Sequence, residues 1–170
     1  MLILLIGPKG SGKSHIGRIL ESYLCVHFFH VESLWMAYYA ECKASGKQPT
    51  ISEGIQTVHP SIANALRQYD RVCVETTGAS SEILNALISL GQESGIFIVR
   101  VQAPLDICLQ RISVRDQTNQ IQLDTDSIQK IYHLSASLEI PCDLVIENTA
   151  LTEEQIVKLF TEALMTCTGS

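Results

Sequence analysis

The sequence predicts a three-layer α/β fold, in which helices cover both faces of a parallel sheet of five strands. Strand-like and helix-like segments alternate along the 170 residues, and no repeat or low-complexity linker interrupts them. The strand-like segments are nearly continuous apolar runs, as in strands that are buried on both faces. A glycine-rich loop joins the first strand to the first helix. In a sheet of this kind, ligands bind at the carboxyl ends of the strands.

The first strand and the first helix lie on either side of the glycine-rich loop. Residues 1–6 are all apolar and have the length of a buried strand. The helix after the loop has apolar residues at the spacing of one helical face: Ile16, Ile19, Leu20, Tyr23 and Leu24. Residues 25–31 are interpreted as a second strand, which ends near Glu32.

The centre of the chain has the least regular pattern. Between residues 33 and 59 we expect only a short aromatic helix at 34–39 and a loop at 45–49. A helix near 60–69, which begins at a proline, is expected to lead into a third strand at 71–75.

The next helix and strand have clearer boundaries. A serine at position 80 or 81 is a typical helix N-cap, because its hydroxyl can accept a hydrogen bond from the first turn. Gly91 is expected to end that helix, since glycine is the usual residue just past a helix. A fourth strand is predicted over residues 96–103.

The C-terminal part continues the alternation. Pro104 is tolerated at a first helical position, and it opens a helix that runs to about Arg115. Another helix is predicted at 127–138 and a fifth strand at 143–147. Residues 152–155 form a capping box for the last helix. We interpret residues 1–170 as one domain.

Composition excludes several classes of function. A net charge of −6 and a pI near 5.3 argue against a general nucleic-acid binder, which would have a basic face. The six cysteines form no CxxC pair and have no histidine at metal-binding spacing, which favours a reducing compartment. No segment approaches the 18 apolar residues of a membrane span. We therefore expect a cytoplasmic protein without nucleic-acid or membrane partners.

The glycine-rich loop carries the strongest signal. It is a complete G-x-x-x-x-G-K-[ST] motif, made of Gly7, Pro8, Lys9, Gly10, Ser11, Gly12, Lys13 and Ser14. Its glycines let successive backbone N–H groups face a phosphate, and the helix N-terminus adds partial positive charge. Lys13 is expected to reach the β- and γ-phosphates, and the Ser14 hydroxyl to bind Mg²⁺.

Two acidic residues are expected near this loop. Glu32 and Glu75 lie at or just past the ends of the second and third predicted strands. A carboxylate there can hold Mg²⁺ directly or through water, or it can accept a proton from an attacking hydroxyl. Each could instead be a solvated strand-end acid or a helix cap. Thr76, Thr77 and Gly78 follow Glu75 and offer hydroxyls and a close-approaching backbone to a substrate.

Two arginines predict a lid. Arg111 and Arg115 lie four residues apart, on one face of the helix after the fourth strand. A polar stretch follows at 116–120, and together these features suit a lid over about 111–126 that closes over a transferring phosphate. The alternative is a pair of surface arginines that favour a helix C-terminus.

The chain resembles the P-loop kinases of small molecules, the nucleoside-monophosphate-kinase-like group that includes shikimate, gluconate and adenylate kinases. The resemblance lies in the glycine-rich loop, in residues 101–111 with Arg115 and Asp116 after them, and in residues 143–149. It implies a P-loop NTPase fold and binding of Mg·ATP, with the phosphates on the loop.

The same resemblance implies where the rest of the substrates bind. The adenine of ATP would lie between the Arg111 region and the loop at Asn148 and Thr149. Residues from about 33 to 70 would bind the phosphate acceptor. Within this segment, Trp35, Tyr38 and Tyr39 could stack on a base or sugar, or could pack as core.

The differences from the family pattern restrict the chemical class of the phosphate acceptor. Shikimate kinases carry Asp-x-Asp after the second strand and a glycine run after the third, where this chain has residues 30–32 and 75–78. The only arginine of the acceptor segment is Arg67, with Lys43, Lys47 and His59 as weaker candidates. Because carboxylates and phosphates are normally bound by arginines, a small and mostly uncharged hydroxyl compound fits best.

We therefore expect ATP-dependent phosphorylation of a small metabolite, with Glu32 as the base or as a ligand of metal-bound water. Two alternatives stay open. One is a nucleotide-binding or regulatory module with weak ATPase activity. The other is a nucleoside monophosphate kinase, against which the shortage of arginines argues.

Overall fold

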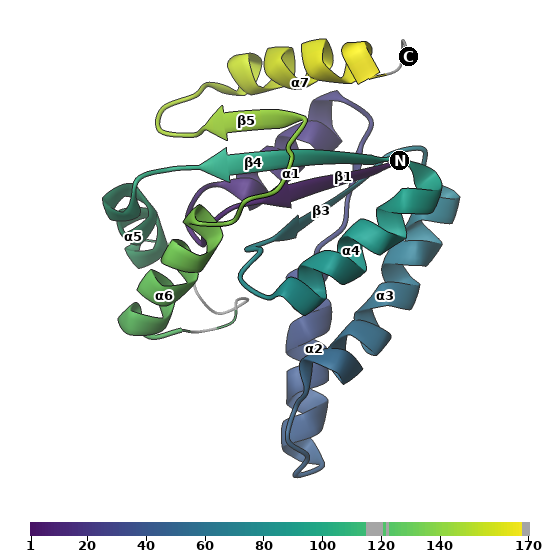
Figure 1. The fold of residues 1–170 in the computed structure, drawn as a ribbon, viewed down its shortest axis with the longest axis vertical. Coiled ribbons are helices and arrows are strands. Elements are labelled where there is room, and N and C mark those ends of the chain that lie inside the picture. Colours follow the sequence, from purple (N-terminus) through teal and green to yellow (C-terminus); the bar gives the residue numbers. More distant parts are fainter. Residues whose placement is uncertain (115–120, 122, 168–170) are drawn as a thin grey trace.

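The computed structural model describes residues 1–114, 121 and 123–167, and within them it contains one parallel sheet (Figure 1). The sheet has five strands in the order β2-β3-β1-β4-β5, all parallel. The strands are β1 (Leu2–Ile6), β2 (His27–Phe28), β3 (Val72–Thr76), β4 (Ile96–Gln102) and β5 (Leu144–Glu147). The predicted α/β class and five-stranded parallel sheet are confirmed.

Helices cover both faces of the sheet, as predicted. In the described residues they are α1 (Lys13–Tyr23), α2 (Val31–Ala44), α3 (Ile51–Gln68), α4 (Ser81–Ser94), α5 (Leu105–Ser113), α6 (Thr125–Ala136) and α7 (Glu153–Cys167). One apolar core lies between the sheet and α1 with α7, and a second lies between the sheet and α2, α3 and α4 (Figure 1). No helix of the described residues is long and apolar enough to span a membrane.

The central strand β1 belongs to both cores. Ile3 and Leu5 pack into the core with α1 and α7, whereas Leu2, Leu4 and Ile6 pack into the core with α2, α3 and α4. None of the five is more than 1% exposed. Burial on both faces explains why residues 2–6 are apolar without alternation.

Two predicted helix caps are confirmed. Ser80 accepts a hydrogen bond from the backbone N–H of Ile83 at 3.3 Å. At the start of α7, the Thr152 N–H donates to the Gln155 side chain at 2.9 Å and the Gln155 N–H donates to the Thr152 hydroxyl at 3.3 Å. This reciprocal pair is the capping box that the sequence predicted.

For the centre of the chain, the predicted loop at 45–49 is confirmed, but the predicted helices are wrong, because α2 covers Val31–Ala44 and α3 covers Ile51–Gln68. Helix α3 begins nine residues before Pro60, so that proline lies inside the helix. Thr50 caps it by accepting a hydrogen bond from the Glu53 N–H at 3.3 Å. The helix continues through Pro60 because Val58 and Ile62 are buried in the core that lies between α3 and the sheet. This burial stabilises the helix by more than the loss of one backbone hydrogen bond at the proline destabilises it.

Two element ends also differ from the prediction. The second strand is only His27–Phe28, since the chain leaves the sheet edge at Phe29, whose N–H makes the last bond to Cys73 O at 2.9 Å. Gly91 does not end α4, which continues to Ser94. A Cβ on Gly91 would meet Ile96, so this glycine permits close packing inside the helix.

Candidate active site

The glycine-rich loop links β1 to α1 at the carboxyl end of the sheet. Gly10 and Gly12 have φ angles of +85° and +96°, a left-handed conformation that favours glycine. A Cβ on Gly12 would also collide with the side-chain amide of Asn148. The loop conformation therefore requires glycine at both positions.

Lys13 points into the curve of this loop. Its ammonium group donates hydrogen bonds to the carbonyl oxygens of Gly7 at 2.8 Å and Pro8 at 2.9 Å. The residue is 7% exposed. Burial lowers the pKa of the ammonium group, while the negative charge of Glu75 opposes that shift. The cation is thus held inside the loop by main-chain dipoles and a nearby carboxylate.

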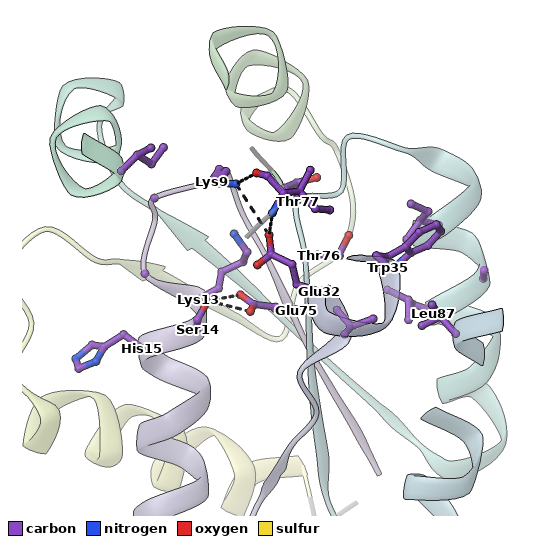
Figure 2. A pocket seen from close by; sticks show the side chains of 18 of the residues that line it. Lys9, Lys13, Ser14, His15, Glu32, Trp35, Glu75, Thr76, Thr77 and Leu87 are labelled. Carbon is purple, nitrogen blue, oxygen red and sulfur yellow. Dashed lines mark hydrogen bonds and ion pairs between the residues drawn. The ribbon is translucent and has the colours of Figure 1, made fainter. Parts of the chain in front are cut away.

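Ser14 and Glu75 form a pair of oxygen donors beside Lys13. The Ser14 hydroxyl lies 2.9 Å from each carboxylate oxygen of Glu75 (Figure 2). Glu75 is the penultimate residue of β3, where it is paired in register with Leu5 of β1. A hydroxyl and a carboxylate are ligands that Mg²⁺ accepts.

This donor set fits Mg²⁺ rather than a transition metal. The described residues contain no group of three or more His, Cys, Asp or Glu side chains that could hold a metal ion. Mg²⁺ is usually bound by one or two carboxylates together with substrate phosphates and water, so a fuller cluster is not required.

Glu32 faces the same cleft from a different element than predicted. It lies in the first turn of α2 and not at a strand end, because β2 is short. Its Oε1 accepts a hydrogen bond from the Ile121 N–H at 3.0 Å and lies 4.0 Å from the ammonium group of Lys9. Lys9 in turn donates to the Ile121 carbonyl oxygen at 2.6 Å. We refer to these three residues as the Lys9–Glu32–Ile121 bridge.

Arg111, Asn148 and Thr149 meet on the outer side of the loop. The Arg111 guanidinium donates to Thr149 O at 3.1 Å and lies 3.4 Å from Gly10 O. Asn148, which is 5% exposed, donates its amide to Ser11 O at 2.8 Å. The three residues predicted to surround adenine are therefore neighbours.

Part of the predicted lid cannot be placed. Arg115 lies outside the described residues, as does most of the segment from 115 to 122. Arg111 is on α5, which ends at Ser113. The lid over 111–126 and the role of Arg115 remain predictions.

The predicted substrate residues after β3 divide into two groups. Glu75, Thr76 and Thr77 line the cleft. Gly78 does not: a Cβ there would meet the side chains of Ile6 and Leu138. Its φ of +73° belongs to a turn in which the Thr76 hydroxyl accepts a hydrogen bond from the Gly78 N–H at 3.2 Å.

A single cleft of about 420 Å³ runs from the loop to the space between α2, α3 and α4. The inner part is lined chiefly by Trp35, Tyr39, Val58, His59, Ile83 and Leu87, which we call the apolar chamber. Figure 2 shows Lys13, Ser14 and Glu75 on one side of the cleft, Trp35 and Leu87 on the other, and Glu32 between them. His15, in the first turn of α1, is also among the residues that line the cleft.

The aromatic residues of α2 divide into two groups. Tyr38 is structural, since its hydroxyl lies 3.1 Å from Thr50 O and accepts a hydrogen bond from the Thr50 N–H at 2.9 Å. Trp35 and Tyr39 line the cleft, and Trp35 is also part of the core with α3 and α4. Stacking of either ring on a substrate stays a prediction.

The sequence offered four candidate cations to bind the acceptor, but it could not predict where their side chains lie. Arg67, Lys43 and Lys47 do not line the cleft, and Lys47 pairs with Glu53 at 2.8 Å on the surface. His59 does line it. The sequence did not indicate that His59 lines the cleft, because the predicted helix begins only at Pro60, whereas α3 begins at Ile51.

Comparison with known proteins agrees with this architecture. A family model described as an AAA domain matches residues 2–138. No curated protein matches the sequence. Among solved structures, a shikimate kinase from Aquifex aeolicus is 19% identical over 100% of both chains, with a TM-score of 0.60. A sugar kinase from Janibacter is 15% identical over 96% of this chain and 94% of that one, with a TM-score of 0.67.

A third structure contains ligands. An APS kinase from Mycobacterium tuberculosis, in complex with AMPPNP and APS, is 16% identical over 96% of both chains, with a TM-score of 0.64. At these identities the likeness establishes the fold. The chain has the P-loop NTPase fold that these small-molecule kinases share.

Proposed function

We propose, from the premise that this chain belongs to the AAA domain family, that it transfers the γ-phosphate of ATP to a hydroxyl group of a small, mostly uncharged metabolite. The observation that carries this proposal is one cleft that extends from the glycine-rich loop to the apolar chamber. A protein that only binds or hydrolyses a nucleotide needs no second chamber beside the phosphates. A kinase does, because both substrates must meet within reaction distance.

The residues at the loop end have complementary roles in this proposal. The loop N–H groups and Lys13 bind the β- and γ-phosphates, and Arg111 supports the loop from outside. Ser14 and Glu75 would hold Mg²⁺, which when bound neutralises charge on the phosphates. Catalysis then consists mainly of positioning and of stabilising negative charge.

Glu32 is the proposed proton acceptor. Its carboxylate lies between the loop end and the apolar chamber (Figure 2). As the acceptor oxygen bonds to the γ-phosphorus, the bond to the β-phosphate oxygen breaks, ADP leaves, and the hydroxyl proton passes to Glu32. Among the described residues, the Ile121 N–H donates to Oε1 of Glu32, which leaves Oε2 to take the proton.

The relatives add support of a general kind. Two of the structures with this fold are named for small-molecule acceptors, shikimate and sugar, and a third was solved with AMPPNP. These names concern those proteins, and they make a small-molecule acceptor the natural class to test here.

The test is acceptor-dependent turnover. The purified protein is incubated with Mg·ATP and panels of sugars, nucleosides, hydroxy acids and apolar alcohols, and phosphorylated products are followed by ³¹P NMR. We expect one class to raise ADP release well above the rate without acceptor. ADP release that no acceptor stimulates would contradict the proposal and favour a nucleotide-binding module with weak ATPase activity.

A further inference from the structure

The side chain of Lys9 connects the glycine-rich loop to the first turn of α2 (Figure 2). Its ammonium group donates a hydrogen bond to the Ile121 carbonyl oxygen at 2.6 Å and lies 4.0 Å from Oε1 of Glu32. The N–H of the same Ile121 donates to that Oε1 at 3.0 Å. Ile121 thus anchors the cation through its carbonyl group and the carboxylate through its amide group.

This bridge is partly shielded from water. The side chain of Lys9 is 17% exposed and that of Glu32 is 35% exposed. Two opposite charges attract each other more strongly where solvent is partly excluded than on an open surface. The anchoring on one backbone unit adds to this effect, because neither side chain can turn away without losing a hydrogen bond.

Lys9 is the cation that holds Glu32. Within the part of the chain that the structure describes, it is the one lysine or arginine within 4.0 Å of this carboxylate. Lys13, the other lysine in the lining of the cleft, donates to carbonyl oxygens of the loop instead. Glu75 is in contact with the Ser14 hydroxyl. The charged groups at this end of the cleft therefore have separate partners, and the ionic contact of Glu32 is with Lys9.

The bridge fixes one oxygen of the Glu32 carboxylate and thereby defines the position of the other. Both contacts are made with Oε1, so Oε2 can move only about that fixed point. Reacting groups must be held close to their productive geometry by side chains that are themselves held in place. A displacement of about 1 Å in such a group can lower the rate about 100-fold.

The bridge also joins the two parts of the cleft. Lys9 belongs to the loop that is proposed to bind the phosphates, and Glu32 begins the helix that carries Trp35 and Tyr39 into the lining of the chamber. We propose that Lys9 is a positioning residue, which holds Glu32 where a hydroxyl group approaching the γ-phosphate can give up its proton. This inference rests on the proposed kinase function.

The test is a double-mutant cycle on acceptor-dependent turnover. Lys9→Met removes the ammonium group at nearly constant length, and we expect kcat to fall about 10- to 100-fold. Glu32→Gln removes the proton acceptor, and we expect kcat to fall about 100- to 10,000-fold. Because Lys9 acts through Glu32, adding Lys9→Met to Glu32→Gln should lower kcat by no more than about threefold further.

Three further measurements separate positioning from other roles of Lys9. Lys9→Arg keeps the positive charge and the hydrogen-bond donors, so it should restore most of the turnover that Lys9→Met loses. Binding of Mg·AMPPNP to Lys9→Met, measured by isothermal titration calorimetry, should stay within about threefold of wild type. Lys43→Met is the matched control, because Lys43 is exposed on α2 and does not line the cleft, and its turnover should equal that of wild type. If Lys9→Met does not fold, Lys9→Gln replaces it in the same cycle.

The outcomes distinguish this inference from the proposed function. An equal loss of kcat from Lys9→Met in the wild-type and Glu32→Gln backgrounds would overturn the positioning role. Binding of Mg·AMPPNP that weakens while kcat at saturation is unchanged would assign Lys9 to the phosphates, and would overturn it too. Both results leave the kinase function standing, since the wild-type protein still turns over an acceptor. Wild-type ADP release that no acceptor stimulates would overturn the kinase function and the role of Lys9 together.

Discussion

The two ends of the cleft are organised in opposite ways. At the loop end, polar side chains already have protein partners: Lys13 is bonded to loop carbonyls, Ser14 to Glu75, and Glu32 to Ile121 N. In the apolar chamber, the His59 Nε2 atom has no partner among the described residues. The charged side chains of the loop end are held by protein partners, whereas the walls of the chamber are mostly apolar. Recognition of the proposed phosphate donor and of the proposed acceptor should therefore be separable.

The largest effect should come from the loop end. Lys13→Ala removes the cation that is proposed to contact the transferred phosphate, and we expect turnover to fall by several orders of magnitude. Steady-state ADP release measures this. Lys158→Ala, at an exposed position of α7, is the control, and equal loss of activity there would contradict the assignment.

The proposed metal pair gives the next effect. Glu75→Gln keeps the size of the side chain but removes its charge beside Ser14. We expect the half-saturating Mg²⁺ concentration to rise about 10- to 100-fold, as when a metal-site residue is weakened. A Mg²⁺ titration of turnover tests this, with the exposed Glu82→Gln as control. An unchanged Mg²⁺ requirement would remove Glu75 from the metal site.

The chamber can be altered through its rigid wall. Gly54→Ala forces the Trp35 ring off α3, and we expect a loss of about 1–3 kcal/mol in the free energy of unfolding. Urea unfolding measures that loss. Nucleotide binding should persist, because the glycine-rich loop is unchanged. A second change, Trp35→Leu in the same protein, should restore stability relative to Gly54→Ala, and a failure to do so would show that the contact is not the cause.

The smallest expected effect concerns the helix that carries His59. Thr50→Ala removes the N-cap of α3 and should cost about 1 kcal/mol of stability. Thr57→Ala lies inside the same helix, where alanine is the better helix former, so it should be neutral or stabilising. Thermal or urea unfolding of both variants compares them. Equal losses would mean that the cap contributes nothing specific.

The sequence predicted the loop end of the cleft but not the apolar chamber. The loop and the two confirmed caps are encoded by residues within a few positions of each other, so a local pattern is sufficient. The chamber is assembled from α2, α3 and α4, which are separated in sequence, and no local pattern describes its walls. The unpartnered nitrogen of His59 is a property of its three-dimensional surroundings.

Two signals in the centre of the chain were misinterpreted. Pro60 predicts a helix start, although burial of Val58 and Ile62 on either side stabilises a helix that continues through it. Thr50 and Glu53 have the Thr-x-x-Glu spacing of a helix N-terminus, which would have indicated α3. Glu32 was expected at a strand end, but the early departure of the chain from the sheet edge places it on α2.

The shared strand β1 has a consequence for local stability. Its side chains belong to both cores and its backbone is paired on both sides, with β3 and β4. The base of the glycine-rich loop can therefore open only when both cores open. Hydrogen exchange at the amides of β1 should require global unfolding, whereas the two-residue edge strand β2 can exchange through local fraying. We therefore expect the proposed phosphate site to be anchored in the part of the described molecule that opens most slowly.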